Sequence, residues 1–308
     1  MNKAPIILFV YNRPWHTKQT VEALQKNELA KDSELFIYSD APKDASAEQA
    51  VEEVRDYIRN IDGFKNITVV ERNENWGLAK SIIDGVTKIV NEYGKIIVLE
   101  DDHVTSKYFL NYMNDALEFY KERKEVWHIS AWNYPLGGFV SSKKAFLWRV
   151  MNCWGWATWS DRWQHFEKDT DKLLSEFDEK DIYRFNLDGE IDFWSQLLAN
   201  KEKKIETWAI YWYATIFKQH GLCLNPEKSF VRNIGLDSSG VHCSESYDMD
   251  NLFLNQNTRM SFPEELIEDK RSVEKIKSMQ RRNRKKKPFA VRAINKASRY
   301  FMGKNIIR

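Results

Sequence analysis

Features that mark several other protein classes are scarce or missing in this chain of 308 residues. It has only three cysteines, Cys153, Cys223 and Cys243, which are widely spaced and form no C-x-x-C pair. Their odd number and spacing indicate reduced thiols in a cytoplasmic protein and argue against a disulfide framework or a zinc site. The apolar run 5–10 is too short for a signal peptide, and no run reaches transmembrane length. We therefore expect a chain that does not itself cross a membrane.

A net charge of only +2 conceals an uneven distribution of charge along the chain. From Lys270 to Arg308 there are 15 lysines and arginines against one acid, a net charge of +14. The first 269 residues hold the other 32 basic and 44 acidic residues, a net charge of −12. The segment 270–308 is thus predicted to be a separate basic tail.

The composition otherwise describes a soluble globular protein, with 43% apolar and 30% charged residues. A chain of this length can bury a proper core as one large α/β domain or two small ones. Aromatic residues make up 14%, including 12 tryptophans. Such rings stack on sugar faces, although many simply fill a core.

The first half alternates apolar strands with amphipathic helices. We predict strands at 5–10, 34–39, 66–71 and 95–99, separated by helices around 20–29, 51–61 and 79–92, the last ending on Gly94. This rhythm is typical of a doubly wound, mostly parallel sheet. Because ligands bind at the carboxyl ends of such strands, the residues that follow each strand are candidates for a site.

Three consecutive acids, Glu100, Asp101 and Asp102, follow the fourth predicted strand. Like charges this close repel one another unless a cation lies among them. Mg²⁺ and Mn²⁺ prefer oxygen ligands, and often bind through one or two carboxylates together with substrate phosphates. The triplet therefore predicts a metal–diphosphate site, with an ordinary acidic loop as the alternative.

The motifs together resemble those of glycosyltransferases with the GT-A fold, close to family-2-like bacterial sugar transferases. The triplet also resembles that of Golgi N-acetylglucosaminyltransferases. The resemblance spans about residues 5–245 and rests on the segments 9–14, 39–40, 75–79, 98–102, 153–163, 233–235 and 239–242. It implies an α/β fold with a GT-A (Rossmann-like), mostly parallel sheet flanked by helices. It also implies a nucleotide-sugar half at 1–125, an aromatic-rich acceptor half at 126–269 and the basic tail at 270–308.

The resemblance also implies roles for individual residues. Asp102 would bind Mn²⁺ or Mg²⁺ directly, with His242 from a glycine- and serine-rich loop as a further ligand. The donor, a nucleoside-diphosphate sugar expected to carry UDP, would contact Tyr11, Asn12, Arg13, Asp40, Asn75, Gly77, Lys80, Glu100 and Asp101. For Arg13 a surface salt bridge is an equal alternative.

An inverting transfer needs a general base for the acceptor hydroxyl. The segment 188–194 holds Glu190 and Asp192, which two positions apart on a helix would face different ways. We predict Asp192, because it adjoins the aromatic pair Phe193 and Trp194, while capping of a helix N-terminus remains open for both acids. Some relatives carry an acid at the position of Ala209, which leaves the base provisional.

Four tryptophans are predicted to stack on the acceptor sugar, with burial in the core as the alternative. They are Trp154, Trp156, Trp159 and Trp194.

The resulting hypothesis is a metal-assisted, inverting hexosyl- or N-acetylhexosaminyltransferase acting in bacterial surface polysaccharide or lipopolysaccharide synthesis. Its acceptor would be a glycan or lipid-linked glycan. The tail would bind an anionic membrane surface, placing the enzyme at the inner face of the cell membrane, and no nucleic acid partner is expected. A nucleotidyltransferase and a non-enzymatic carbohydrate- or nucleic-acid-binding protein remain the alternatives.

Overall fold

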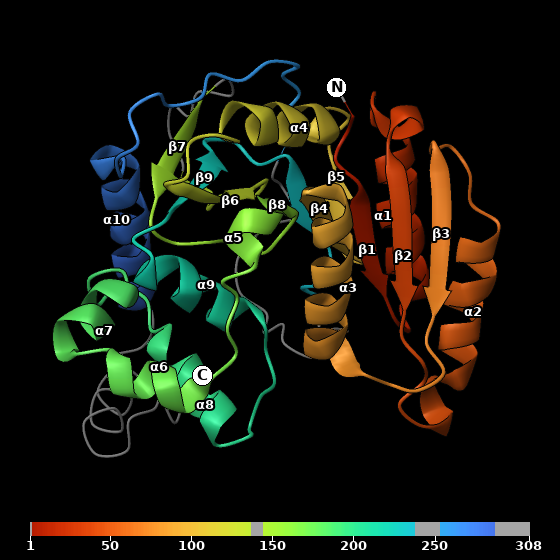
Figure 1. Cartoon of the computed structure of the whole chain (residues 1–308), viewed down its shortest axis with the longest axis horizontal. Coiled ribbons are helices and arrows are strands. Elements are labelled where there is room, and N and C mark those ends of the chain that lie inside the picture. The colour runs from red at the N-terminus through yellow and green to blue at the C-terminus, as the bar shows by residue number, and fades with distance from the viewer. Residues whose placement is uncertain (1, 137–143, 238–252, 287–308) are drawn as a thin grey trace.

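The structure is a computed structural model that describes residues 2–136, 144–237 and 253–286. In the first half, strands and helices alternate along the chain (Figure 1). The elements are β1 (Ile6–Val10), α1 (Pro14–Gln25), η1 (Ala30–Asp32), β2 (Glu34–Ser39), η2 (Ala45–Ala47), α2 (Glu48–Arg59), β3 (Asn66–Glu71), α3 (Gly77–Tyr93), β4 (Lys95–Glu100), β5 (His103–Thr105) and α4 (Phe109–Phe119).

The second half adds short strands and helices to the same sheet. They are β6 (Val126–Ser130), β7 (Ala145–Trp148), β8 (Trp156–Trp159), α5 (Ser160–Trp163), α6 (Thr170–Glu176), α7 (Glu179–Phe185), α8 (Trp194–Lys201), α9 (Ala209–Lys218), β9 (Leu222–Pro226), β10 (Val231–Asn233) and α10 (Lys270–Lys286).

One eight-stranded sheet runs through the molecule in the order β3-β2-β1-β4-β8-β6-β9-β7. The first four strands in this order are parallel to one another, and β8 is antiparallel to both β4 and β6. Figure 1 shows β1, β2 and β3 side by side, with the second-half strands beyond β4. A small antiparallel sheet of β5 and β10 brings the chain around 233 next to the chain around 103.

Both faces of the central strands are buried, as expected for parallel strands in an α/β sheet. All five residues of β1 are buried. Ile6 and Leu8 pack with α1, α2 and α4 on one face, whereas Ile7 and Phe9 pack with α3 and α9 on the other. The sheet therefore forms the middle layer between two layers of helices.

The predicted fold class is confirmed, and the four predicted strands occur at 6–10, 34–39, 66–71 and 95–100. Helix α3 ends where the sequence predicts, on Gly94 in a left-handed conformation with φ of +78°. In the parallel register Phe9 lies beside Tyr38 and Glu100. The carboxyl ends of β1, β2 and β4 consequently lie next to one another.

The predicted tail begins as a docked helix. The 17 residues of α10 bury Val273, Ile276 and Met279 against the second half. In addition, Lys277 pairs with Asp188, and two arginines of α10 pair with Glu190. Within the described ranges, none of the helices is both long and apolar enough to span a membrane.

Candidate active site

The acid triplet lies at the carboxyl end of β4, where Arg13 pairs with two of its three acids. Asp101 and Asp102 are each only 5% exposed. The Arg13 Nε donates to Asp101 Oδ2 at 3.3 Å, and its Nη2 donates to Asp102 Oδ2 at 2.8 Å and also to Asp101 Oδ1. The predicted nucleoside contact of Arg13 thus remains a prediction, while the observed partners of its guanidinium are the two aspartates.

Burial dominates the electrostatics of the triplet. It raises the pKa of Glu100, and the carboxylates of Asp102 and Asp101 raise this pKa further. Burial also raises the pKa of Asp101, although the positive charge of Arg13 opposes this change. Two buried acids that stay protonated to a higher pH than usual indicate a site that additional positive charge would stabilise.

One oxygen of Asp102 has no hydrogen-bond partner among the described residues: Oδ1 is buried and unpartnered. The nearest nitrogen is Nε2 of His103, at 3.4 Å from Oδ1. The Nδ1 of His103 accepts the Glu100 N–H at 3.0 Å, so Nε2 carries the proton of the neutral ring. Burial lowers the pKa of His103 to about 4, which keeps the ring neutral at physiological pH. The neutral His103 ring therefore lies beside Asp102 without neutralising it, and no hydrogen bond joins its Nε2 to Oδ1.

A loop from the second half closes over Asp102. The Ile234 N–H donates to the Asp102 backbone oxygen at 2.9 Å, and Asn233 Oδ1 accepts the Gly235 N–H at 2.7 Å. A Cβ atom on Gly235 would lie 2.2 Å from Asp102 Oδ2, so only glycine fits there. The predicted metal ligand His242 lies farther along this loop, outside the described residues.

An unpartnered buried carboxylate oxygen fits a hard divalent cation, which prefers such ligands. The described side chains alone do not complete a cage, because no three His, Cys, Asp or Glu residues among them are grouped for a metal. This donor set fits a cation that takes its remaining ligands from substrate phosphates and water. Asp102 would hold it, with Arg13 as the competing positive charge.

The predicted nucleoside residues after β2 and β3 are held together by the start of α3. Asp40 accepts the N–H groups of Trp76 and Gly77 at 2.9 and 2.8 Å. Asn75 Nδ2 donates to the Ala41 oxygen at 2.7 Å. The Lys80 ammonium lies 3.9 Å from the centre of a Trp76 ring. This cluster supports the strand ends around the triplet, and the nucleoside contacts predicted for it remain predictions.

The other two donor-binding predictions follow β1. Tyr11 and Asn12 are half-buried, and the Tyr11 hydroxyl accepts the Lys43 N–H at 2.9 Å. This bond joins the turn after β1 to the turn after β2.

A cavity of about 480 Å³ opens beside the triplet between the two halves of the chain. Glu100 and Asp102 line one part of it, and Leu78 and Ala79 of α3 lie nearby. The opposite part belongs to the second half and is rich in aromatic rings. The aromatic wall consists of Trp132, Tyr134, Trp154, Phe193, Trp208 and Tyr213.

The structure brings only one of the four predicted acceptor tryptophans to this cavity. Trp154 lines it, whereas Trp156 and Trp159 are 1% and 3% exposed and belong to the core. Trp194 packs 5.2 Å from Phe177, away from the cavity wall. Burial of large rings in the core, the open alternative, describes Trp156 and Trp159. The sequence reasoning missed Trp132 and Trp208, whose apolar surroundings resemble those of any core tryptophan.

The two predicted base residues do not line the cavity either. Asp192 accepts the Ser195 N–H at 3.2 Å at the start of α8. Glu190 pairs with Arg281 at 2.8 Å and with Arg284, both from α10. The acid that lines the cavity outside the triplet is Glu206, which precedes α9 and is mostly exposed. The sequence shows no signal for it beyond its position three residues before Ala209.

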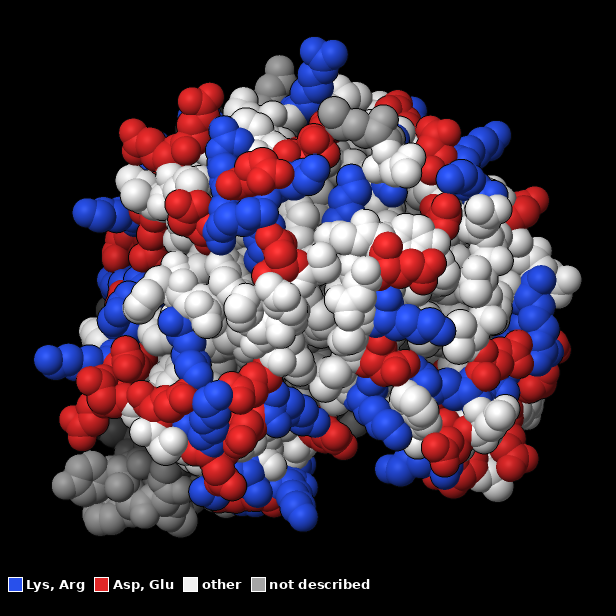
Figure 2. Space-filling view, in the orientation of Figure 1, with Lys and Arg blue, Asp and Glu red and all other residues white. Residues whose placement is uncertain are grey.

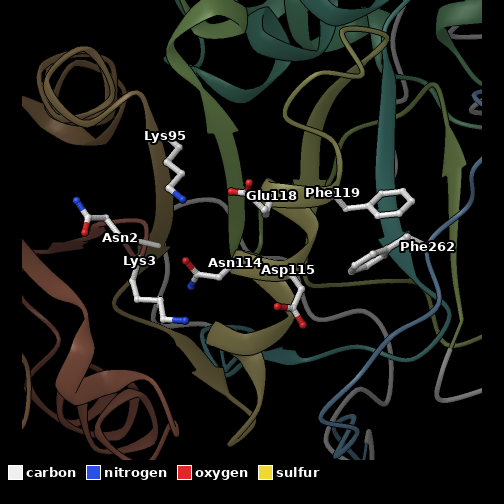
Figure 3. A pocket seen from close by; sticks show the side chains of 8 residues that line it. All are labelled: Asn2, Lys3, Lys95, Asn114, Asp115, Glu118, Phe119 and Phe262. Carbon is white, nitrogen blue, oxygen red and sulfur yellow. The ribbon is translucent and has the colours of Figure 1, made fainter.

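A second cavity, of about 380 Å³, lies at the opposite end of β4 (Figure 3). Lys95, at the amino end of the strand, lies on one side, and Phe119 and Phe262 lie on another. The amino and carboxyl ends of a strand lie on opposite edges of a parallel sheet, so this cavity is separate from the triplet.

Comparison with known proteins finds a family that one segment of the chain resembles. The sequence profile described as glycosyl transferase family 2 matches residues 6–145, which run from β1 to the first residue of β7. This stretch contains Arg13, Asp40 and the triplet. No curated protein matches the chain in sequence.

Several solved structures share a similar arrangement at low identity. S. aureus TarS matches at 19% identity and a TM-score of 0.31, over 46% of this chain and 24% of TarS, so the match spans about a quarter of that protein's length. The mannosyltransferase PcManGT from Pyrobaculum calidifontis, in complex with GDP-Man and Mn²⁺, matches at 10% identity and a TM-score of 0.40, over 71% of this chain and 69% of PcManGT. The galactosyltransferase LgtC, with donor and acceptor sugar analogs, matches at 9% identity and a TM-score of 0.36, over 69% of this chain and 70% of LgtC.

The family match covers the part of the chain that builds the acid triplet at the edge of a mostly parallel sheet. The chain has the GT-A fold, and its segment 6–145 is similar to glycosyl transferase family 2.

Proposed function

We propose that this glycosyltransferase moves a sugar from a nucleoside diphosphate, with UDP as the expected nucleotide, to a hydroxyl group of a glycan acceptor. The observation that carries the proposal is the buried, unpartnered Oδ1 of Asp102 beside a cavity of about 480 Å³. The cavity has the triplet on one side and aromatic rings on the other. It therefore offers a place for a diphosphate next to a place for a sugar ring.

The departing diphosphate gains negative charge, which a bound Mn²⁺ or Mg²⁺ would offset as a Lewis acid. In this chain Asp102 would hold the ion, and the neutral His103 ring lies beside its carboxylate at 3.4 Å. Arg13 would be released from Asp102 when the ion binds, and its guanidinium then suits the diphosphate oxygens. The Gly235 loop covers the same carboxylate and limits access of water.

The acceptor hydroxyl must lose a proton as the new bond forms, and an inverting reaction needs a base on the acceptor side. Glu206 meets the positional requirement, because its residue lines the cavity on the second-half side. It pairs with Lys168 at 3.0 Å in the absence of substrate. We therefore propose Glu206 for comparison with Asp192, whose carboxylate binds the start of α8.

We also propose that the enzyme acts at an anionic membrane surface on a lipid-linked glycan of a bacterial surface polysaccharide. The support is the run of positive charge that begins in α10 and continues to Arg308. On the face shown in Figure 2, acidic and basic side chains of the described residues are interspersed, without the broad basic area that nucleic acid binding favours.

Calorimetry with UDP and GDP, with and without Mn²⁺, tests the donor part of the proposal. We expect binding that requires Mn²⁺ in the wild type and is lost in Asp102→Asn. Asp115→Asn, which changes an acid of the second cavity, serves as the matched control and should bind as the wild type does. Nucleotide binding that is unchanged without Mn²⁺ and unchanged in Asp102→Asn would contradict the metal–diphosphate role of Asp102.

A further inference from the structure

Two buried hydrogen-bond donors on the wall of the active-site cavity lack a partner among the described residues. They are the indole Nε1–H of Trp132 and the side-chain amide Nδ2–H of Asn152. Trp132 is 6% exposed and Asn152 is 9% exposed, and both residues line the cavity that holds Asp102. A buried donor without an acceptor is costly, so its retention beside a substrate cavity points to a ligand group that completes it.

Elsewhere in the described chain, buried indole N–H groups do find acceptors. Trp148 donates to Asn225 at 2.8 Å, Trp159 to the Leu117 oxygen at 3.1 Å and Trp163 to Thr87 at 2.9 Å. Trp156 is the exception, because its indole N–H also has no partner among the described residues. The Trp156 ring does not line the cavity and stacks behind Trp208, which does. Trp132 differs from Trp156 because it lines the cavity.

The backbone at both donors is held by buried hydrogen bonds. The Trp132 oxygen accepts from Asn225 Nδ2 at 2.7 Å, and the Asn152 oxygen accepts from His128 Nε2 at 3.0 Å. His128 in turn accepts the Trp212 N–H at Nδ1, which fixes the ring with its proton on Nε2. The donors therefore belong to a rigid wall, as recognition of a fixed group requires.

The Trp132 ring is held from both sides by aromatic neighbours. Tyr134 and Trp154 each contact it edge to face, at 4.7 Å between ring centres. These contacts keep the indole N–H at one position on the wall, and they surround it with apolar surface.

The charges around the cavity narrow the chemistry of the ligand group. The described lining residues include the carboxylates Glu100, Asp102 and Glu206 but no lysine, arginine or histidine. A further anionic group on the ligand, besides the diphosphate that the metal would hold, would face these acids without a cation among the lining residues, whereas a neutral carbonyl oxygen accepts hydrogen bonds without added charge. Beside the donors, Met151 and Trp154 provide apolar surface suited to a methyl group.

We propose that Trp132 and Asn152 form a subsite for the N-acyl group of an amino sugar, with the carbonyl oxygen accepting from both side chains. The inference rests on the proposed function, because it takes the cavity as the sugar site. The N-acyl group can belong to the transferred sugar or to the acceptor sugar, and the two sources are separated by experiment.

Binding of paired ligands to the full chain in the presence of Mn²⁺ tests the subsite. In the donor arm, UDP-N-acetylglucosamine is compared with UDP-glucose, and UDP-N-acetylgalactosamine with UDP-galactose. In the acceptor arm, with UDP present, methyl N-acetylglucosaminide is compared with methyl glucoside. We expect the N-acetyl member to bind at least about tenfold more tightly in one arm, as one or two hydrogen bonds allow.

Two substitutions should remove this preference. Asn152→Asp keeps the size of the side chain and replaces the donor with an acceptor, so the ratio within a pair should fall to about twofold or less. Trp132→Phe should act in the same direction, and Trp156→Phe, which deletes the unpartnered N–H behind the wall, should keep the wild-type ratio. Because Asn152→Asp preserves shape, it decides the question if Trp132→Phe does not fold.

The outcomes separate this inference from the proposed function. Wild-type protein that binds both members of every pair equally, or variants that keep the tenfold ratio, would overturn the N-acyl subsite. If the wild type shows no Mn²⁺-dependent binding of UDP, the metal–diphosphate role of Asp102 would be overturned instead. Mn²⁺-dependent binding with a preference confined to one arm identifies the source of the N-acyl group.

Discussion

Replacing Arg13 with glutamine should remove the positive charge that pairs with Asp101 and Asp102 and leave these acids without compensation. In the structure the guanidinium contacts both Asp101 and Asp102, and the Arg13 side chain is only 17% exposed. Removal of one partner from a buried ion pair costs about 3–5 kcal/mol, because the remaining charge is left without compensation. We expect the free energy of unfolding of metal-free Arg13→Gln protein to fall by about this amount at about pH 8.

The loss should depend on pH in a defined direction. Burial already raises the pKa of Glu100 and of Asp101 in the folded protein, and removal of Arg13 raises them further. A carboxyl group has a pKa of about 4 in the unfolded chain. If its pKa is higher in the folded protein, its full contribution to stability is present at a pH below the unfolded pKa. This contribution is lost as the pH rises through the folded pKa. Arg13→Gln should therefore be closest to the wild type at about pH 5 and weakest at about pH 8.

Mn²⁺ should restore the variant more than it stabilises the wild type. In the wild type the ion would share the Asp102 carboxylate with the guanidinium on Oδ2, whereas in Arg13→Gln the whole carboxylate is available. A ligand at about 100 times its dissociation constant adds about 2.7 kcal/mol to the stability of the folded state. Urea unfolding followed by tryptophan fluorescence, with and without Mn²⁺ at both pH values, measures each quantity.

Arg149→Gln is the matched control for this experiment. Arg149 has a similarly covered side chain, 16% exposed, and also contacts two carboxylates, Asp188 and Glu268, away from the cavity. It should lose comparable stability without recovery by Mn²⁺. Equal Mn²⁺ effects in the two variants, or a smaller effect in Arg13→Gln than in the wild type, would refute the reasoning that Arg13 and a metal compete for Asp102.

Three further predictions concern acid stability, the base and the tail. Burial lowers the pKa of His128 to about 3 in the folded protein. Its contribution to stability is therefore present above pH about 6.5, the pKa of histidine in the unfolded chain, and is lost as the pH falls toward the folded pKa. In urea titrations between pH about 6.5 and the folded pKa, His128→Gln should lose less stability with falling pH than the wild type does. Glu206→Gln should lower kcat by about 10²-fold or more, while Asp192→Asn should keep near wild-type kcat and near wild-type stability, because an Asn oxygen can also accept the Ser195 N–H; the reverse order in steady-state assays would return the base to Asp192. Deleting 287–308 should abolish sedimentation with anionic liposomes but preserve turnover on a soluble acceptor, and unchanged sedimentation would contradict the membrane role of the tail.

The sequence was most informative where local pattern and local structure coincide. The strand 95–100 contains four consecutive apolar residues, 96–99, which favour strands and are buried on both faces, so its position follows from neighbouring residues alone. Gly94 ends the preceding helix for an equally local reason, since glycine adopts the left-handed conformation at little cost. The same holds for the order of elements in the first half, which the parallel sheet requires.

The second half was less predictable because its strands are short and its pairings join distant residues. Strand β8 is inserted between β4 and β6 and is antiparallel to both, although β6 comes first along the chain. Trp156, at the start of β8, is core, whereas Trp154 two positions earlier lines the cavity. Which ring is covered depends on strand direction and packing rather than on the local sequence.

By itself, the sequence determined the α/β class with a mostly parallel sheet and the position of the acid triplet at the carboxyl end of its fourth strand, because apolar periodicity and charge clustering are local properties. Only the tertiary structure decided how these acids are used. It places Arg13 between Asp101 and Asp102 and leaves Asp102 Oδ1 unpartnered. It also gives the cavity wall to Trp132, Asn152 and Glu206. These relations join residues that are tens to more than a hundred positions apart, and packing in three dimensions brings them together.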